Sequence, residues 1–410
     1  MTNDERIDLL SSAGRILLEN GGETYRAEET VRRMAAAMGM EEPQAFAIPS
    51  GLFLSYTDEE GEKQTGIVRI HRTGTRLDRV DEVNRVSRAL AHHELGEGEL
   101  ALQLHRAEHL GEGEPWWALP LMALISAAGF ALMFGGGPVD MLVGGLCAAL
   151  TQIFPLMLPR EHRGGLSNVI VGGIECALLP LLFTSLTGIG NGEAMIAAAL
   201  MPLVPGLSMT TGVQDLIRGD MVSGVVNAAG ALLTAALLAG GSMLGTTLFQ
   251  LTGLKETAPA ALSLPSFWRE AVLFLAGLLG AGGFAGLLAA PRKTLLQSAL
   301  LGGGVYLLYV LLSLRSEAVG MLACGVVSSL GAQWMARQFH HVSTLYEAAA
   351  ILPLVPGLGL YRAMRSIGEG AYREGAAMAA EAMGLILLIS VGLAVGSALN
   401  TFLYSAGQRH

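Results

Sequence analysis

The chain has 410 residues and a formal net charge of −9, and only 15% of its residues are charged; roughly 25% is usual in soluble globular proteins. Residues 1–114 hold 22 of the 35 acidic and 13 of the 26 basic residues, so residues 115–410 are neutral overall. This distribution excludes a nucleic-acid-binding protein, which needs a basic surface. It predicts an acidic domain, 1–114, followed by a multi-spanning membrane domain.

The N-terminal domain carries both helix and strand patterns. Apolar residues at helical spacing predict four helices, over 5–20, 24–38, 77–94 and 97–110. Two segments rich in β-forming residues, 46–57 and 65–70, flank a turn at 58–62 and predict a hairpin. His92 and His93 are adjacent and point to different helix faces, so we expect neither a metal site there nor a cofactor. The prediction is a small α+β domain.

The rest of the chain contains apolar segments close to the roughly 20 residues that cross a bilayer. We expect ten spans, near 116–134, 139–157, 167–188, 193–211, 221–249, 268–290, 294–314, 317–336, 344–362 and 374–404. The fourth and ninth are short and contain prolines, so each is either a full span or a re-entrant segment.

An internal repeat relates the two halves of this region. The segment 197–207 returns as 348–358 at an offset of 151, with both prolines and the following glycine retained. The same offset pairs four further glycines, the first being Gly219 with Gly370. We predict two repeats, 115–251 and 265–410. Because equivalent points lie five spans apart, the second repeat should face the opposite way, as in inverted-repeat transporters.

The repeated Pro-Leu-Val-Pro-Gly segments predict broken helices. Proline removes a backbone donor, and the glycine permits a sharp change of direction. Broken helices at matching positions of two repeats indicate a transporter's binding site, although structural kinks are the alternative. The candidate break residues are Pro202, Pro205, Gly206, Pro353, Pro356 and Gly357.

Polar residues in and near the spans supply the other candidates. Carboxylates inside a bilayer are costly and are therefore candidates for proton coupling; these are Glu175, Asp215 and Glu381. Arginines after the breaks could hold a substrate carboxylate, or could simply lie near headgroups. The further substrate-site candidates are Thr211, Asp215, Arg218, Asn227 and Arg362, and Asp140 and Asn168 are polar candidates that could instead cap helices.

The loop charges favour a cytoplasmic N-terminal domain. With that domain inside, Arg160 and Arg163 also fall inside, and the first outer loops carry no lysine or arginine. We expect a multi-pass protein of the inner (plasma) membrane.

The sequence resembles the threonine/serine exporter family. The matching segments are 17–24 with 38–40, 135–140, 167–168, and Leu203-Val204-Pro205-Gly206 followed by 215–220 and Gly224. The resemblance covers nearly the whole chain, including two modules that some bacteria encode as separate subunits. It implies export of threonine and serine driven by the proton motive force. Some members have an asparagine where this chain has Thr211, so substrate identity does not carry over through that position.

Three alternative functions are consistent with the sequence. The first is a secondary exporter of threonine/serine-like amino acids, working by alternating access with protons as partners. The second is an exporter of succinate-like dicarboxylates, because two-subunit relatives resemble such exporters. The third is a membrane-anchored hydrolase or sensor, for which ten spans would be excessive. A homo-oligomer is left open.

Overall fold

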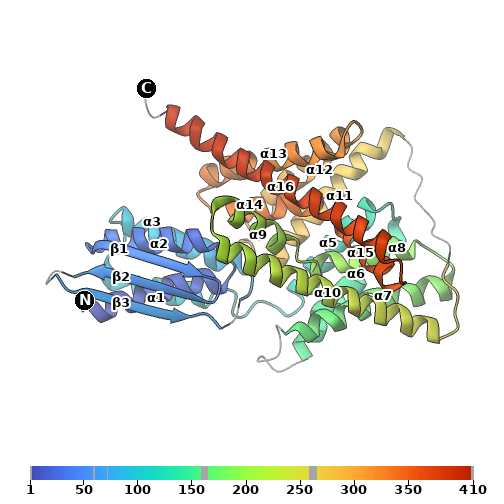
Figure 1. Ribbon diagram of the computed structural model, residues 1–410, viewed down its shortest axis with the longest axis horizontal. Helices are drawn as coiled ribbons and strands as arrows, with labels where there is room; N and C mark the ends of the chain where they lie inside the picture. Colours follow the sequence, from blue (N-terminus) through green and yellow to red (C-terminus); the bar gives the residue numbers. More distant parts are fainter. Residues whose placement is uncertain (1, 59–60, 72, 158–164, 258–265, 408–410) are drawn as a thin grey trace.

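The computed structural model describes residues 2–58, 61–71, 73–157, 165–257 and 266–407. It consists of an α+β domain at one end and a large helical domain (Figure 1). Arg160 and Arg163, on which the orientation argument depends, lie outside the described residues, as does the expected start of the second repeat at residue 265.

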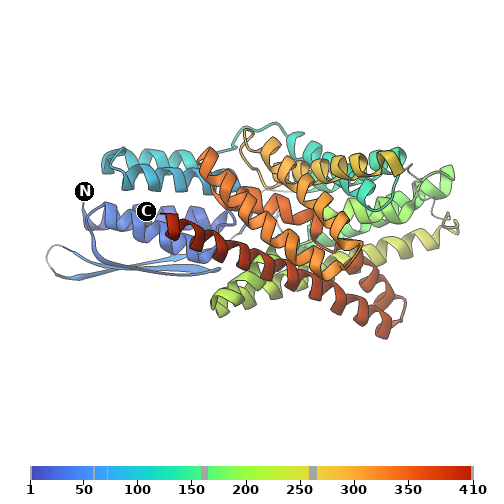
Figure 2. The ribbon, with the colours of Figure 1, turned by 90° about the horizontal axis from the view of Figure 1, so that it is seen from above.

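The N-terminal domain is built in three layers. A sheet of β1 (Glu41–Ile48), β2 (Gly51–Thr57) and β3 (Lys63–Arg69) is covered on one face by α1 (Asn3–Glu19) and α2 (Thr24–Ala37). Helices α3 (Leu77–Ala91) and α4 (Glu97–Glu108) pack on α1 and α2 and form the third layer (Figure 2). The four helices begin and end within three residues of the predicted bounds. The core lies between the sheet and the first helical layer, with Leu17, Met34 and Leu52 almost fully buried.

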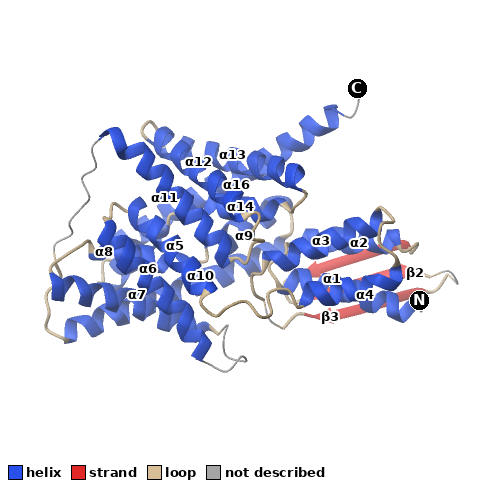
Figure 3. Ribbon diagram, turned by 180° about the vertical axis from the view of Figure 1, so that it is seen from behind, coloured by secondary structure: helices blue, strands red, loops and turns tan. Residues whose placement is uncertain are grey.

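The predicted hairpin is wrong in one respect. The segment 46–57 is not one strand but two, and the sheet is an antiparallel three-stranded meander in the order β1-β2-β3 (Figure 3). Ile48 pairs with Gly51 across a tight turn at Pro49-Ser50. Proline cannot donate to a strand ladder, and proline, serine and glycine together favour a turn. β1 also begins five residues earlier than predicted, at Glu41.

The helical domain contains two sets of elements in the same order. The first set is α5 (Ala118–Met133), α6 (Pro138–Met157), α7 (Leu166–Thr187), α8 (Gly192–Leu200), η2 (Met201–Leu203), α9 (Gly206–Arg218) and α10 (Met221–Leu251). The second set is α11 (Ser266–Leu287), α12 (Leu295–Ser313), α13 (Glu317–Phe339), α14 (Ser343–Ile351), η3 (Leu352–Leu354), α15 (Gly357–Gly368) and α16 (Tyr372–Gly407). From α8 onward, each element of the first set begins 151 residues before its counterpart in the second.

Ten apolar segments are present, but they are not ten straight spans. Seven described helices are long and apolar enough to cross a membrane, and two bent pairs raise this number to nine. The bent pairs are the fourth and ninth segments, Gly192–Leu203 with Gly206–Arg218 and Ser343–Leu354 with Gly357–Gly368. The remaining segment, α5, has only 16 residues. The predicted ends of the bent segments were too early, because each continues as a second half-helix beyond its Pro-Gly break.

Glycines let the two long helices of each half approach closely. A Cβ at Gly241 of α10 would lie 2.3 Å from the carbonyl oxygen of Ile170, and one at Gly392 of α16 would lie 2.4 Å from that of Leu322. Only glycine fits where helix backbones meet in this way. By contrast, Gly230 and Gly240 have no neighbour within 4 Å at the Cβ position, so packing does not require glycine there.

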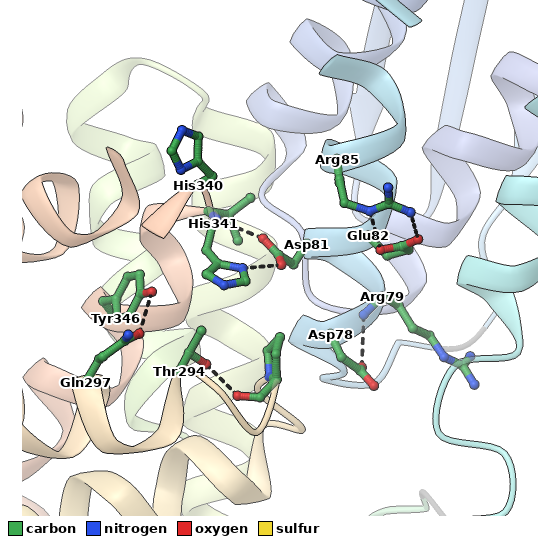
Figure 4. A network of polar contacts seen from close by, with 12 residues as sticks. Asp78, Arg79, Asp81, Glu82, Arg85, Thr294, Gln297, His340, His341 and Tyr346 are labelled. Atoms are coloured by element: carbon green, nitrogen blue, oxygen red, sulfur yellow. Dashed lines mark hydrogen bonds and ion pairs between the residues drawn. The ribbon is translucent and has the colours of Figure 1, made fainter. Parts of the chain in front are cut away.

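The N-terminal domain is hydrogen-bonded to the helical domain at the start of α3. The N–H groups of Leu77 and Asp78 donate to the carbonyl oxygens of Leu288 and Ala289, at 2.9 and 3.1 Å. Asp81 accepts from the N–H of Val342 at 2.9 Å and contacts the ring of His341 at 2.7 Å (Figure 4). These contacts fix the N-terminal domain against the loops that follow α11 and α13.

Candidate functional site

The two Pro-Gly breaks have nearly identical backbones. Val204 and Val355 are extended, with ψ of 127° and 126°, and end the short 3₁₀ turns η2 and η3. Pro205 (φ −77°, ψ 48°) and Pro356 (φ −75°, ψ 57°) then occupy the centre of inverse γ-turns. These turns are closed by bonds from Gly206 N–H to Val204 and from Gly357 N–H to Val355. The half-helices diverge by 54° and 51°, so the repeated sequence produces a repeated break.

The two breaks pack directly against each other. A Cβ at Gly206 would lie 3.0 Å from both γ-methyl groups of Val355, and one at Gly357 would lie 2.1 Å from the sulfur of Met201. Glycine at both positions lets each break lie close against side chains of the other half. The two broken elements meet at the centre of the helical domain, where broken backbone is tolerable only if protein or a cavity surrounds it.

A cavity of about 440 Å³ lies beside the second break. It is lined by all five candidate residues of the second half: Pro353, Pro356, Gly357, Arg362 and Glu381. Aromatic side chains of α5 and α12 form much of the remaining wall: Phe130, Phe134, Tyr306 and Tyr309. The end of α5 and the start of α13 line it, so the cavity lies on the side away from the N-terminal domain.

The cavity carries both signs of charge. Arg362 donates to Glu193 of α8 at 2.7 Å, so the cation is anchored by the first half. Glu317 accepts from the hydroxyl of Tyr309 at 3.0 Å. Glu381 also lines the cavity, from α16. A guanidinium and two carboxylates in a partly aromatic cavity complement a small zwitterion.

The first break places a different polar pair in the core. Asp215 is only 3% exposed and accepts from the side-chain amide of Asn227 at 3.1 Å. The positions 151 residues later are Ser366 and Met378, whose side chains also meet, at 3.9 Å. The same contact is therefore charged in the first half and neutral in the second.

Polar pairs join the halves at both ends of the broken elements. Gln214 of α9 donates to Glu347 of α14 at 3.2 Å, and Arg362 of α15 pairs with Glu193 of α8. Thus the second half-helix of each half contacts the first half-helix of the other. Figure 1 places α9 and α14 beside the N-terminal domain, and α8 and α15 at the opposite end.

The N-terminal domain covers the end formed by α9 and α14. The ring of Tyr25 stacks under Arg218, 4.3 Å from its guanidinium carbon, and Thr24 donates to Asp220 at 2.8 Å. Arg26 is paired with Glu23 and donates to Ser343 of α14 at 2.8 Å. Burial, with Glu23 close by, raises the pKa of Tyr25 to about 12. The start of α2 therefore binds both halves at once.

The other predicted residues lie apart from this centre. Glu175 is half-buried in α7, and its Oε2 atom has no hydrogen-bond partner in the described part of the chain. Asp140 is a buried cap, which accepts from the N–H groups of Gly137 and Asn191. Thr211 donates to the carbonyl of Leu207 within its own helix. Asn168 lies in the first turn of α7. The structure brings none of these four into the cavity of the second break.

Sequence reasoning missed Glu347, Glu23, Tyr25 and Arg26. Glu347 stands alone among apolar residues, where the first repeat has Ile196, and this departure from the repeat was an available signal. The other three lie in the N-terminal domain, and nothing local in the sequence links them to partners as distant as Ser343, 317 positions from Arg26.

Comparison with known proteins matches both halves of the chain. Threonine/serine exporter family models match residues 8–249 and 273–399. The "Threonine/serine exporter" of Corynebacterium glutamicum is 24% identical over 87% of this chain and 75% of its own. The "Probable threonine/serine exporter" of Mycobacterium tuberculosis is 25% identical over 98% of this chain and 78% of its own.

A relative of the first half is named for a different substrate. The "Probable succinate transporter subunit YjjP" of Escherichia coli is 23% identical over 60% of this chain and 95% of its own. No solved structure matches the chain. The family consists of exporters rather than enzymes, and this excludes the membrane-anchored hydrolase. With its two family matches and its apolar helices, the chain belongs to the threonine/serine exporter family of multi-pass membrane proteins.

Proposed function

We propose that this protein exports threonine/serine-like amino acids, driven by the proton motive force, by alternating access between two inverted repeats. The observation that carries the proposal is the meeting of the two Pro-Gly breaks beside a cavity with both signs of charge. The equivalent helices α8 and α14 start at opposite ends of the helical domain, which supports the inverted arrangement (Figure 1).

The cavity is better suited to an amino acid than to a dicarboxylate. Arg362 would bind the substrate carboxylate, and Glu381 or Glu317 would bind its ammonium group. A dicarboxylate would need two cations, yet Arg362 is the one arginine or lysine among the described residues that line this cavity. Export of succinate-like substrates is the second candidate, because of the relative from Escherichia coli.

With the N-terminal domain cytoplasmic, this conformation is open to the outside. The cavity lies on the far side of the second break, while the N-terminal domain and the Gln214–Glu347 pair close the near side. Export would begin when this near side opens and the far cavity closes. Asp215, Glu347 and Glu381 are our candidates for the proton-carrying groups, with Glu175 as a more distant one.

Substrate-dependent thermal stabilisation of the purified protein tests the site. We expect threonine and serine, but not succinate, to raise the melting temperature. Arg362→Gln and Glu381→Gln should remove this shift, whereas Glu374→Gln, two helical turns before Glu381 on α16, should retain it. Stabilisation by succinate alone would favour the dicarboxylate exporter. Equal stabilisation of all variants by threonine would contradict the proposed site.

A further inference from the structure

The cavity of the second break is richer in carboxylates than a neutral amino acid requires. Of the described residues that line it, Arg362 is the one cation, and Glu317 and Glu381 are the carboxylates. The Nε atom of Arg362 donates to Glu193 at 2.7 Å, so a third carboxylate faces the same guanidinium. A cleft with an excess of one sign of charge concentrates ligands of the opposite sign. This cavity therefore favours a substrate that carries additional positive charge.

Both lining carboxylates remain available to a ligand. Within the described part of the chain, Glu381 has no hydrogen-bond or ion-pair partner. Glu317 accepts from the hydroxyl of Tyr309 at 3.0 Å, and this donor is neutral. Both glutamates are exposed, so an ammonium group can reach them. A neutral amino acid brings one ammonium group and would leave one of the two carboxylates without a cation.

Aromatic rings beside Glu317 add a second attraction for an ammonium group. The rings of Tyr306 and Tyr309 lie 6.3 Å apart between their centroids, and the hydroxyl of Tyr309 holds Glu317. Phe130 and Phe134 of α5 form a second ring pair in the same wall, 6.2 Å apart. A cation is attracted to the face of an aromatic ring. A carboxylate next to aromatic rings is therefore suited to an ammonium group.

The cavity also has room for a side chain longer than that of threonine. Its volume of about 440 Å³ lies within the range of roughly 300–1,000 Å³ that is usual for small-molecule pockets. Three methionines line it, Met133, Met321 and Met378, and flexible thioether side chains adapt to ligands of different shape. The aliphatic part of a long, positively charged side chain can pack on such an apolar wall while its ammonium group contacts a carboxylate.

We propose that the cavity also binds amino acids with a second ammonium group, such as lysine and ornithine, as a further class of substrate. This inference rests on the proposed function, since it uses the same cavity. The terminal N–H groups of Arg362 would bind the α-carboxylate, and Glu381 would bind the α-ammonium group. Glu317 and the ring of Tyr309 would bind the side-chain ammonium group.

The melting temperature of the detergent-purified full-length chain, measured over a range of ligand concentrations, tests this proposal. Lysine is compared with norleucine, which has the same carbon chain but no side-chain ammonium group. We expect lysine to bind about tenfold more tightly, as one charged hydrogen bond of about 1.4 kcal/mol would give. Glu317→Gln should remove this preference because the amide carries no charge. Glu374→Gln, which lies on α16 outside the lining of the cavity, should retain it.

Threonine and cadaverine complete the test. If threonine stabilises the protein while lysine and norleucine bind equally, the inference is overturned and the proposed threonine/serine export stands. Tighter binding of lysine without any stabilisation by threonine would support the inference and contradict the proposed export of threonine. A preference for lysine that survives in Glu317→Gln would overturn the assigned site. Cadaverine, which is lysine without its carboxylate, should bind more weakly than lysine; equal binding would assign the cavity to amines and overturn the proposal.

Discussion

Asp81 of the N-terminal domain and Asp140 of α6 accept equivalent backbone hydrogen bonds in the two halves of the helical domain. The Oδ1 atom of Asp140 accepts from the N–H of Asn191 at 2.7 Å, and that of Asp81 accepts from the N–H of Val342 at 2.9 Å. Asn191 and Val342 are 151 residues apart and are the N-cap residues of α8 and α14. The second half therefore takes this contact from the N-terminal domain, which makes that domain part of the transporter's structure.

Replacing Asp81 with alanine should loosen the N-terminal domain. The change leaves the buried N–H of Val342 unsatisfied and removes the contact with His341 (Figure 4). Such losses cost about 1–3 kcal/mol. We expect a lower melting temperature and faster proteolysis between residues 109 and 117. Glu82→Ala, which removes only the exposed pair with Arg85, is the matched control, and identical behaviour of the two variants would contradict this role.

Gly206→Ala should abolish transport while leaving the protein expressed. The new Cβ would lie 3.0 Å from both γ-methyl groups of Val355, a branched side chain with little freedom to move. Overpacking of this kind costs about 1–3 kcal/mol, and here it acts where the halves must move past each other. Gly230→Ala, with open space at its Cβ position, should transport normally. If Gly206→Ala transports at the wild-type rate, the packing of the two Pro-Gly breaks against each other is not needed for transport.

Two variants, Asp215→Asn and Glu347→Gln, test proton coupling separately from substrate binding. Each amide keeps a hydrogen-bonding group beside Asn227 or Gln214 but cannot release a proton. If either carboxylate carries the proton, its variant should lose gradient-driven flux and keep substrate exchange at zero gradient. These two fluxes can be measured in the same proteoliposomes. Full gradient-driven flux in both variants would exclude both residues and leave Glu381 and Glu175.

Alkaline pH should weaken the contact of the N-terminal domain through Tyr25. Burial raises the pKa of Tyr25 from 10.0 to about 12, so the folded protein keeps the phenol protonated while the unfolded chain loses the proton. This contribution to stability is complete below pH 10 and is lost as the pH rises through 12. We expect melting temperatures to fall more steeply above pH 10 in wild type than in Tyr25→Phe. Parallel curves would contradict the prediction.

The sequence predicted the breaks well and the contacts between distant parts poorly. The breaks depend on local chemistry, since proline and glycine change the backbone at their own positions. The motif also occurs twice, once in each half, so each copy supported the prediction made from the other. The turn at Pro49-Ser50 was also a local signal, but the β-forming residues on both sides concealed it. The meeting of Tyr25 with Arg218, or of Asp81 with Val342, depends on how two domains pack, which no local pattern encodes.

Some of the residues that line the proposed substrate cavity were candidates from the sequence. Repeat position and charge led to Arg362 and Glu381, which both line the cavity of the second break. The same reasoning grouped Asp140 and Glu175 with them, although the structure places both elsewhere. A carboxylate inside an apolar helix indicates a polar role, but whether it caps a helix or lines a cavity is decided by the helix packing around it.

The most direct test is labelled-substrate flux in proteoliposomes with an imposed pH gradient, comparing threonine with succinate. We predict threonine flux that collapses when the gradient is dissipated and that is lost in Arg362→Gln but retained in Arg315→Gln. Gradient-dependent flux of succinate without threonine would contradict the assigned substrate, and threonine flux that persists without the gradient would contradict the coupling to protons.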